Sequence, residues 1–543
     1  MLSTKDTRVT GHSIAVTDND DDVVFMAQPA TAHPDRPSSL TLQGRFVAGE
    51  AFFNYAAFGS LREGLPAVNL ATQLYGGLAV HAMLAGVNVS LFQYAFRPLL
   101  VAFLLEFDAD QIQAGESLVQ WMGTLSVFIG LTSDCYPFFG YRRKSYMLLG
   151  WIFACVMYTT IAILHATGNR DGYTYLVVTT LASLGFQVAW ITSLALTIEL
   201  AQREHLYERG HLQAFFFVLH FGSALLAQVG IMTTVFPADD GVSMLPTTTM
   251  HMGECATALA IVCILPLPFI SRYLSEPPAN CSSRLTLTIR LRELWHLLQQ
   301  KVVYCIFFFL VGSLFLLGAS SPSVTQAIMF WSGIMPSKMQ YINFFTVLPK
   351  LAAVLIWKSV LVNWNWRRMW LLGLTIFIVG QLALLPCVYF SAVRHEWYFY
   401  VMILIAQLPQ GWMDLLVVIM PTEIADIGRE GVMIGLVNSF IVLITIASGS
   451  LWTSLNEAVD MNVSLEDILE DSAETRHQIF VAALIYGAIN ALGVFTAWFL
   501  PAQKLDAQQM RAFGGYNRMA RNAILFVFAA LLIYDLVENL AKI

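Results

Sequence analysis

Long apolar stretches separated by shorter polar connections fill the chain from about residue 67 to residue 500. A helix of about 20 apolar residues is long enough to cross the hydrocarbon core of a bilayer. The stretches lack the alternation of apolar and polar residues that marks transmembrane β-strands. The pattern therefore predicts twelve membrane-spanning helices, over the approximate ranges 70–94, 115–137, 145–166, 173–199, 212–236, 253–274, 301–321, 339–362, 368–391, 396–421, 431–455 and 478–500.

A long polar break at residues 275–300 divides the predicted spans into two sets of six. Its second part has the pattern of an amphipathic helix that lies on a membrane surface, so we expect a cytoplasmic linker there. The predicted fold class is an all-α membrane protein with twelve transmembrane helices in two halves. The halves are a six-helix N-terminal bundle over 67–274 and a six-helix C-terminal bundle over 301–500.

The two ends of the chain are more polar than the spans. Residues 1–66 are turn-rich and carry an acidic cluster, and we expect a disordered cytoplasmic tail. Residues 501–543 form a C-terminal tail, in which the apolar run 522–537 is short for a span and contains Asp535. An interfacial helix is the favoured interpretation of this run, and a thirteenth span is the alternative.

The composition agrees with an integral membrane protein, because 57% of the residues are hydrophobic and only 12% are charged. Soluble domains carry roughly 25% charged residues. The seven cysteines form no CxxC pair, and the sequence has no GxxxxGK, HExxH or GxSxG motif. We therefore expect no enzyme, no metal site and no cofactor. We also expect no nucleic-acid partner, because no concentrated basic tract is present. The expected state is a multi-pass monomer in the lipid bilayer, by default that of the plasma membrane.

Positive charges gather in the loops that follow even-numbered spans. Because cations mark the cytoplasmic side of membrane proteins, these loops and the N-terminus are predicted to be cytoplasmic. The cations are Arg142, Arg143, Lys144, Arg272, Arg284, Arg290, Arg292, Arg367 and Arg368, with Arg203, Arg209 and Arg429 in the turns after spans four and ten.

The loop GLTSDCYPFFGYRRKSY, residues 130–146, has a counterpart in the second half, where Lys358 precedes Arg367 and Arg368. The turns after the fourth and tenth spans, IELAQREHLYERG and TEIADIGREG, also correspond. Two six-helix halves with repeated features at cytoplasmic hinges indicate a transporter in which two bundles rock about a central site.

The residue types of the first loop suit a gate. Gly130 allows helices to pack closely, Pro137 ends a helix, and Gly140 permits a turn. Asp134 is costly near a membrane boundary unless it has a partner. Such a group would hold the two halves closed on the cytoplasmic side. The simpler alternative is a set of topology-setting cations beside a capped turn.

Arg142 and Arg143 are the partners expected for Asp134, because a guanidinium offers fork-like donors to a carboxylate. The hinges after spans four and ten hold further charged residues near the cytoplasmic span ends. Gating or hinge roles are assigned there to Glu199, Arg209 and Glu423.

Ionisable side chains deep in apolar spans are costly, so each is a candidate for solute or proton binding. Lys350 in the eighth span would bind a carboxylate or pair with an acid, and Asp414 in the tenth span would be that acid or carry protons. His220 in the fifth span would titrate near neutral pH or pack as a hydrogen-bonded residue. Polar and aromatic groups that would face a flat heterocycle, or pack between helices, are Gln187, Trp190, Gln326 and Asn438.

The loop motif resembles the signature of the folate–biopterin transporter family, a branch of the major facilitator superfamily. The residues that carry the resemblance are Gly130, Ser133, Asp134, Pro137, Gly140, Tyr141, Arg142, Arg143 and Tyr146, with weaker matches at Glu199, Arg203, Glu204, Arg209, Gly210, Gln213, Glu430, Gly431 and Asn438. The resemblance implies a major-facilitator-like transporter of folates or pterins. Such a protein would have a small-molecule solute and protons as partners, and would work by alternating access.

The sequence also departs from the family pattern. The segment WITSLALTI, residues 190–198, lacks the acidic residues that the family usually carries there, and His220 lies where an arginine is common. Two other functions therefore stay open. One is the same fold with a different organic anion or an amphipathic metabolite as solute, and the other is a membrane receptor or scaffold that moves nothing.

Overall fold

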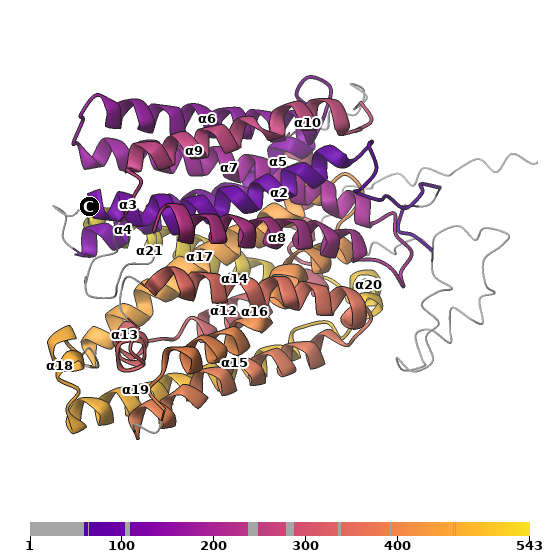
Figure 1. The fold of residues 1–543 in the computed structure, drawn as a ribbon. Coiled ribbons are helices and arrows are strands. Elements are labelled where there is room, and N and C mark those ends of the chain that lie inside the picture. Colours follow the sequence, from indigo (N-terminus) through magenta and orange to yellow (C-terminus); the bar gives the residue numbers. More distant parts are fainter. Residues whose placement is uncertain are drawn as a thin grey trace, which may run out of the picture. The chain divides into compact units, whose positions relative to one another are not determined.

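Helices make up most of the computed structural model, which describes residues 59–62, 64–103, 109–236, 248–278, 287–334, 338–390, 393–459, 461 and 463–542 (Figure 1). All of these residues belong to one compact unit, Asn54–Ile543. Most of the predicted N-terminal tail, residues 1–58, lies outside the described residues. Residues 59–62 are described and lie against the helices, which differs from the expectation of disorder up to residue 66.

The six predicted spans of the first half are present as helices, and three of them are interrupted. The first continues beyond the predicted 70–94, because a π-helical turn links α2 to α3 without ending the span. Pro266 at the first position of α10 accounts for the break after α9, since proline cannot donate a helical hydrogen bond. The elements are α2 (Gly76–Leu91), the π turn Phe92–Phe96, α3 (Arg97–Phe103), α4 (Ala109–Trp121), the 3-10 turn Met122–Leu125, α5 (Ser126–Cys135), α6 (Lys144–Ala166), α7 (Gly172–Ala201), α8 (His211–Thr234), α9 (Met252–Ile264) and α10 (Pro266–Tyr273).

The second half begins after the linker helix α11 (Leu287–Leu297), which lies in the region predicted to hold an amphipathic helix. Its first span is bent by 50° between α12 and α13. The elements are α12 (Lys301–Leu317), α13 (Pro322–Trp331), α14 (Met339–Ile356), the π turn Trp357–Leu361, α15 (Trp366–Tyr389), α16 (Glu396–Ile424), α17 (Glu430–Ala458), α18 (Leu465–Glu470), α19 (Ala473–Ala491), the 3-10 turn Leu492–Trp498, α20 (Lys504–Phe513) and α21 (Arg518–Lys542).

Among the described residues, ten helices are long and apolar enough to cross a membrane, or eleven if the bent pair α12–α13 is one span. These include α21, which was not among the twelve predicted spans. Two predicted spans, α4–α5 and α15, are helical but are not among the ten. The all-α membrane fold is thus confirmed, and the count of twelve is consistent with the structure without being fixed by it.

Several helix pairs join the two halves. Helix α5 packs on α17, α8 packs on α14, and α7 packs on both α16 and α17 (Figure 1). The α5–α17 contact is so close that a Cβ atom added to Gly130 would lie 1.9 Å from the backbone oxygen of Gly431. A glycine is therefore needed at position 130 for the halves to meet in this arrangement.

Helix α21 differs from the predicted interfacial helix over 522–537. It has 25 residues, which corresponds to about 37 Å at the helical rise. It packs against α4 and α17, and the Phe528 ring lies 5.1 Å from that of Phe440. In Figure 1, α20 and the C-terminal end of α21 lie at opposite ends of the bundle. Exposed Phe526 and Ile533 give α21 an apolar outer face that suits lipid, so these features favour a thirteenth span.

We expect this helix to place the two ends of the chain on opposite sides of the membrane. An epitope tag appended after Ile543 should then be detected by antibody on intact cells, whereas a tag before Met1 should be detected only after permeabilisation. An interfacial helix on the cytoplasmic side predicts that both tags need permeabilisation.

Candidate functional site

The predicted gate loop folds back so that its arginine meets its aspartate. Helix α5 ends at Cys135, and the turn that follows places Phe139 and Gly140 at φ angles of +48° and +82°. This left-handed turn leads into α6 and brings Arg143 onto Asp134 as an ion pair, with both side chains 0% exposed. Arg143 also donates to Ser133 Oγ. The predicted partnership of Asp134 with an arginine of this loop is therefore present.

Asp134 also binds the other half of the protein. Its carboxylate accepts hydrogen bonds from the backbone N–H groups of Gly431 (3.3 Å) and Val432 (2.8 Å), in the first turn of α17. The first N–H groups of a helix have no intrahelical partner, and the helix dipole favours a negative charge there. A single carboxylate at the end of α5 thus caps α17, a helix of the opposite half.

Arg62 is a central member of this site that sequence reasoning missed. Its guanidinium forms ion pairs with Glu199 of α7 (3.1 Å) and with Glu430 of α17. The same side chain donates to Gln202 Oε1 (3.0 Å), and two backbone N–H groups of the segment donate to the Gln202 carbonyl. Arg62 lay in a segment predicted to be disordered, and no periodic pattern there distinguished it from other tail residues.

The five residues Arg62, Asp134, Arg143, Glu199 and Glu430 form what we call the gate cluster. Arg143 closes it, because its Nη2 lies 3.4 Å from Glu430 Oε2. Burial opposes the charge of the Arg143 guanidinium, but the carboxylates of Asp134 and Glu430 outweigh it and raise its pKa above the ordinary value. Removing one partner of a buried ion pair costs about 3–5 kcal/mol. The cluster therefore couples the halves strongly while it is complete.

A second charged cluster lies beside the gate cluster and joins Arg209 to Glu423 at 2.8 Å, with both side chains buried. Gln508 of α20 also donates to Glu423 (2.6 Å). The buried Lys504 of α20 donates to the carbonyl of Leu206, in the loop of the first half (3.3 Å). The predicted hinge residues Arg209 and Glu423 are thus brought together across the halves, and α20 reinforces their contact.

Burial also shifts two pKa values near this second cluster. Desolvation lowers the pKa of Lys504 to about 8, and it raises the pKa of Glu204 to about 7. Both Glu204 oxygens accept backbone hydrogen bonds, from Gly210 (2.7 Å) and from Leu212 (2.9 Å), at the start of α8. The Glu204 carboxylate therefore fixes the turn that positions Arg209.

Other predicted gate residues have smaller parts. Arg142 takes part through its backbone N–H, which donates a hydrogen bond to Glu276 Oε1 (2.9 Å). The corresponding loop of the second half has a different arrangement, in which Lys358 lies over the Phe215 ring (4.9 Å) and Arg367 donates to the Leu500 carbonyl (2.6 Å). Among the described residues, the loop with this sequence pattern thus forms ion pairs in the first half and not in the second.

The predicted solute-binding residues fall into separate groups. Lys350 Nζ lies 3.8 Å from Asp414 Oδ2, and both side chains are about a quarter exposed (25% and 29%). The ring of His220 lies 4.9 Å from that of Trp190.

The predicted amide residues are divided between two places. Gln187 and Asn438 both donate to Ser126 Oγ, at 2.9 Å each, and so join α7, α17 and α5. Gln326 lies apart from these groups, exposed on α13 beyond the bend.

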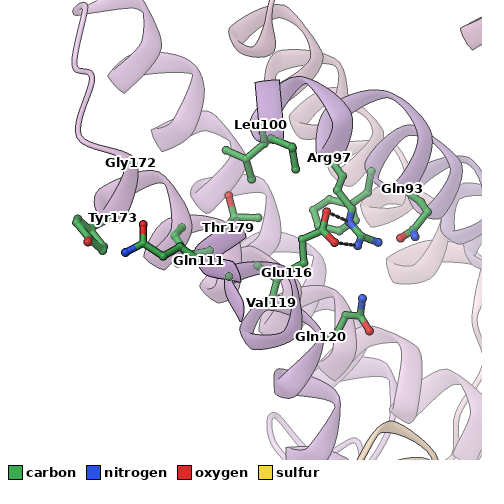
Figure 2. Close-up of a pocket in the computed structure, with 14 residues that line it drawn as sticks. Gln93, Arg97, Leu100, Gln111, Glu116, Val119, Gln120, Gly172, Tyr173 and Thr179 are labelled. Carbon is green, nitrogen blue, oxygen red and sulfur yellow. Dashed lines mark hydrogen bonds and ion pairs between the residues drawn. The ribbon is translucent and has the colours of Figure 1, made fainter. Parts of the chain in front are cut away.

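A further polar pair, Arg97 and Glu116, lies in a small hollow between α3, α4 and the start of α7 (Figure 2). The sequence prediction missed it, because the first span was ended at residue 94 and the second was begun at residue 115. Both residues were thereby assigned to span ends and not to the interior. An arginine within the apolar run YAFRPLLVAF was the available signal.

The family is decided by a match that covers well over half of the chain, since the BT1 family model matches residues 85–468. The chain belongs to the BT1 family. A folate–biopterin transporter of Synechocystis sp. (strain ATCC 27184 / PCC 6803 / Kazusa) is 24% identical over 301 residues, which cover 52% of this chain and 56% of the relative. The match thus spans just over half the length of that curated relative.

Solved structures of major facilitator proteins share the fold. A double-tryptophan mutant of XylE has a TM-score of 0.56 at 12% identity. The match covers 80% of this chain and 97% of the XylE chain. The human organic anion transporter MFSD10 has a TM-score of 0.51 at 12% identity, covering 78% and 99%. The BT1 match confirms the predicted family, and these structures share the predicted fold of a multi-pass membrane protein.

We expect Arg62→Gln to loosen the contact between the halves, because Glu199 and Glu430 lose a shared cation. The thiol of Cys135 is buried beside the gate cluster and reports its opening. In a background whose other cysteines are replaced by serine, maleimide labelling of Cys135 should accelerate at least about tenfold, which corresponds to 1.4 kcal/mol.

The matched control for this experiment is Arg272→Gln, which removes an exposed cation on the same side of the protein. Labelling of Cys135 should stay at the parent rate in that variant. Equal labelling rates in the Arg62→Gln variant and its parent would show that Arg62 does not hold the halves together.

Proposed function

We propose that this protein is a secondary active transporter that moves folate- or pterin-like solutes by alternating access, coupled to protons. The observation that carries the proposal is the gate cluster, where buried charges of both halves meet at one end of the bundle. Such a cluster holds the halves together strongly while it is complete and weakly once one partner leaves. This property suits a gate that must change between a closed and an open state. The BT1 family and the printed function of the Synechocystis relative support the solute class.

The two ends of the bundle differ in how the halves are joined. In the described residues, the ion pairs between the halves lie at the end that carries the loop cations. At the opposite end the contact is between neutral amides, because Gln228 donates to Gln340 Oε1 (2.9 Å) and Gln340 donates to the Tyr94 carbonyl (3.1 Å). A neutral hydrogen bond contributes only about 0.5–1.5 kcal/mol. This difference supports a conformation that is held closed on the predicted cytoplasmic side.

Groups from both halves supply chemistry for a folate-like solute between the gates. Trp190 in α7 and His220 in α8 offer ring surfaces against which a flat pteridine would stack. Lys350 in α14 would receive a carboxylate if it exchanged Asp414 for the solute. Asp414, once released, would take a proton, and His220 is the second proton candidate in this region.

Uptake of labelled folate and biopterin tests this function in cells that lack their own transport of both. We expect wild-type protein at the cell surface to raise uptake of at least one solute, and more strongly at acidic outside pH. Lys350→Gln should lower the uptake of folate by about tenfold, as expected for the loss of about 1.4 kcal/mol of binding. Lys338→Gln, in a pair at 34% and 30% exposure, is the matched control and should leave uptake unchanged.

Three results would contradict parts of this proposal. If the protein reaches the surface and moves neither solute, the folate or pterin class is wrong, and another organic anion becomes the leading solute. If uptake of folate does not respond to a pH gradient, proton coupling is wrong. If no solute moves and Lys350→Gln or Asp414→Asn changes no measured activity, a receptor or scaffold is the better interpretation.

A further inference from the structure

The hollow around Arg97 and Glu116 lies at the end of the bundle away from the gate cluster. Its walls come from α3, α4 and the first turns of α7, and the cavity volume is about 50 Å³. Figure 2 shows the Arg97 and Glu116 side chains directed at each other, with Gln93 and Gln120 beside them. Leu100, Val119 and other apolar residues complete the lining. The pair is thus a charged feature in otherwise apolar surroundings.

The geometry of this pair is that of carboxylate recognition. Arg97 Nε donates to Glu116 Oε1 at 2.8 Å, and Arg97 Nη2 donates to Glu116 Oε2. These two parallel bonds are the bidentate arrangement by which a guanidinium binds any carboxylate. Glu116 therefore occupies the position that a carboxylate of a solute would take.

Stability does not account for the pair. The side chains of Arg97 and Glu116 are 23% and 30% exposed, and partly exposed ion pairs contribute about 0–1 kcal/mol. An ionisable residue inside a membrane span is costly enough to need another reason. These exposed fractions leave part of the guanidinium uncovered by protein atoms.

We propose that Arg97 is the docking point for a carboxylate of an anionic solute, which displaces Glu116 from the guanidinium. This inference rests on the proposed transport function and adds to it a recognition site distinct from Lys350. A cavity of about 50 Å³ has room for about one or two water molecules. A solute therefore reaches Arg97 only when the Glu116 side chain moves away.

Charge balance at this site gives a reason for proton coupling. With Glu116 bound, the charges of Arg97 and Glu116 cancel. A solute carboxylate adds one negative charge, and an uncompensated charge is expensive in surroundings of low dielectric constant. The site becomes neutral again when the displaced Glu116 carboxylate takes one proton from water at that end of the bundle. One proton then enters the site with each solute carboxylate.

The decisive comparison uses two ligands that share a pterin ring. Folate carries glutamate carboxylates, and biopterin carries none. We expect Arg97→Gln to weaken folate binding at least tenfold and to leave biopterin binding within twofold of wild type, as measured by the ligand-induced shift of Tm in detergent. Arg394→Gln is the matched control, because its partner Asp471 and Arg394 are each 24% exposed and lie outside the hollow. That variant should bind both ligands as wild type does.

Glu116→Gln tests the proton step separately, because it keeps the size of the side chain and removes the competing charge. Wild-type folate affinity should rise as the pH falls from about 7.5 to about 5.5, by up to tenfold per pH unit if one proton is taken up. Folate affinity in Glu116→Gln should exceed that of wild type at pH 7.5 and should not change over this range.

The outcomes separate this inference from the proposed function. If Arg97→Gln weakens both ligands equally, or neither, the Arg97 docking site is wrong while folate transport stands. If the folate affinity of Glu116→Gln keeps the pH dependence of wild type, the proton step at Glu116 is wrong. If wild-type protein binds neither ligand, the proposed function fails together with this inference.

Discussion

Burial of two arginines and three carboxylates between two helical bundles is the constraint on which the arrangement of the halves depends. None of these charges is tolerable there alone, because removing a charge from water costs several kcal/mol unless a partner replaces the water. The partners come from four places: a segment before the first span, the loop between the second and third spans, the end of α7 and the start of α17. The halves must therefore meet in one register for every charge to be satisfied. That requirement makes the closed contact specific as well as strong.

Backbone geometry makes this register possible. Gly130 lets α5 approach the first turn of α17 so closely that Asp134 reaches two free N–H groups there. The left-handed turn at Gly140 then returns Arg143 to the same carboxylate. Small residues and a turn thus decide where the charges lie, and the charges decide whether the contact holds. At the opposite end, neutral amides make a weaker contact between the halves, which suits the side from which a solute would enter.

Sequence patterns predicted the parts of this account that repeat along the chain. Apolar length predicted the helices, and the GLTSDCYPFFGYRRKSY motif predicted the Asp134–Arg143 pair and the family. The orientation that the loop cations indicate stays a prediction. Lys350 and Asp414 were each marked as costly charges, and the structure brings them together. The site residues that the sequence did not predict follow no periodic pattern along the chain. Arg62 is one of five cations in the polar segment 1–66. Its role depends on Glu199 and Glu430, which are distant in sequence.

Span boundaries account for the other omissions. Arg97 lay outside the first predicted span and Glu116 at the start of the second, whereas the helices continue past both residues and the two charges neutralise each other. Similarly, the run 522–537 was judged short for a span and contains Asp535, whereas α21 has 25 residues and this aspartate is buried within it. Ion pairs between helices depend on the tertiary structure. A pattern read along one stretch of sequence therefore does not predict them.

The central claim is that the gate cluster holds the two halves closed and that solute binding leads to its opening. It is tested most directly by the distance between spin labels at Tyr207 and Ile427, exposed positions on opposite halves of the cation-rich end. Pulsed electron paramagnetic resonance should give one short distance without solute. A second, longer distance should appear with folate, and it should dominate when Asp134→Asn removes a charge from the cluster. A single distance that is unchanged by folate and by Asp134→Asn would contradict the account.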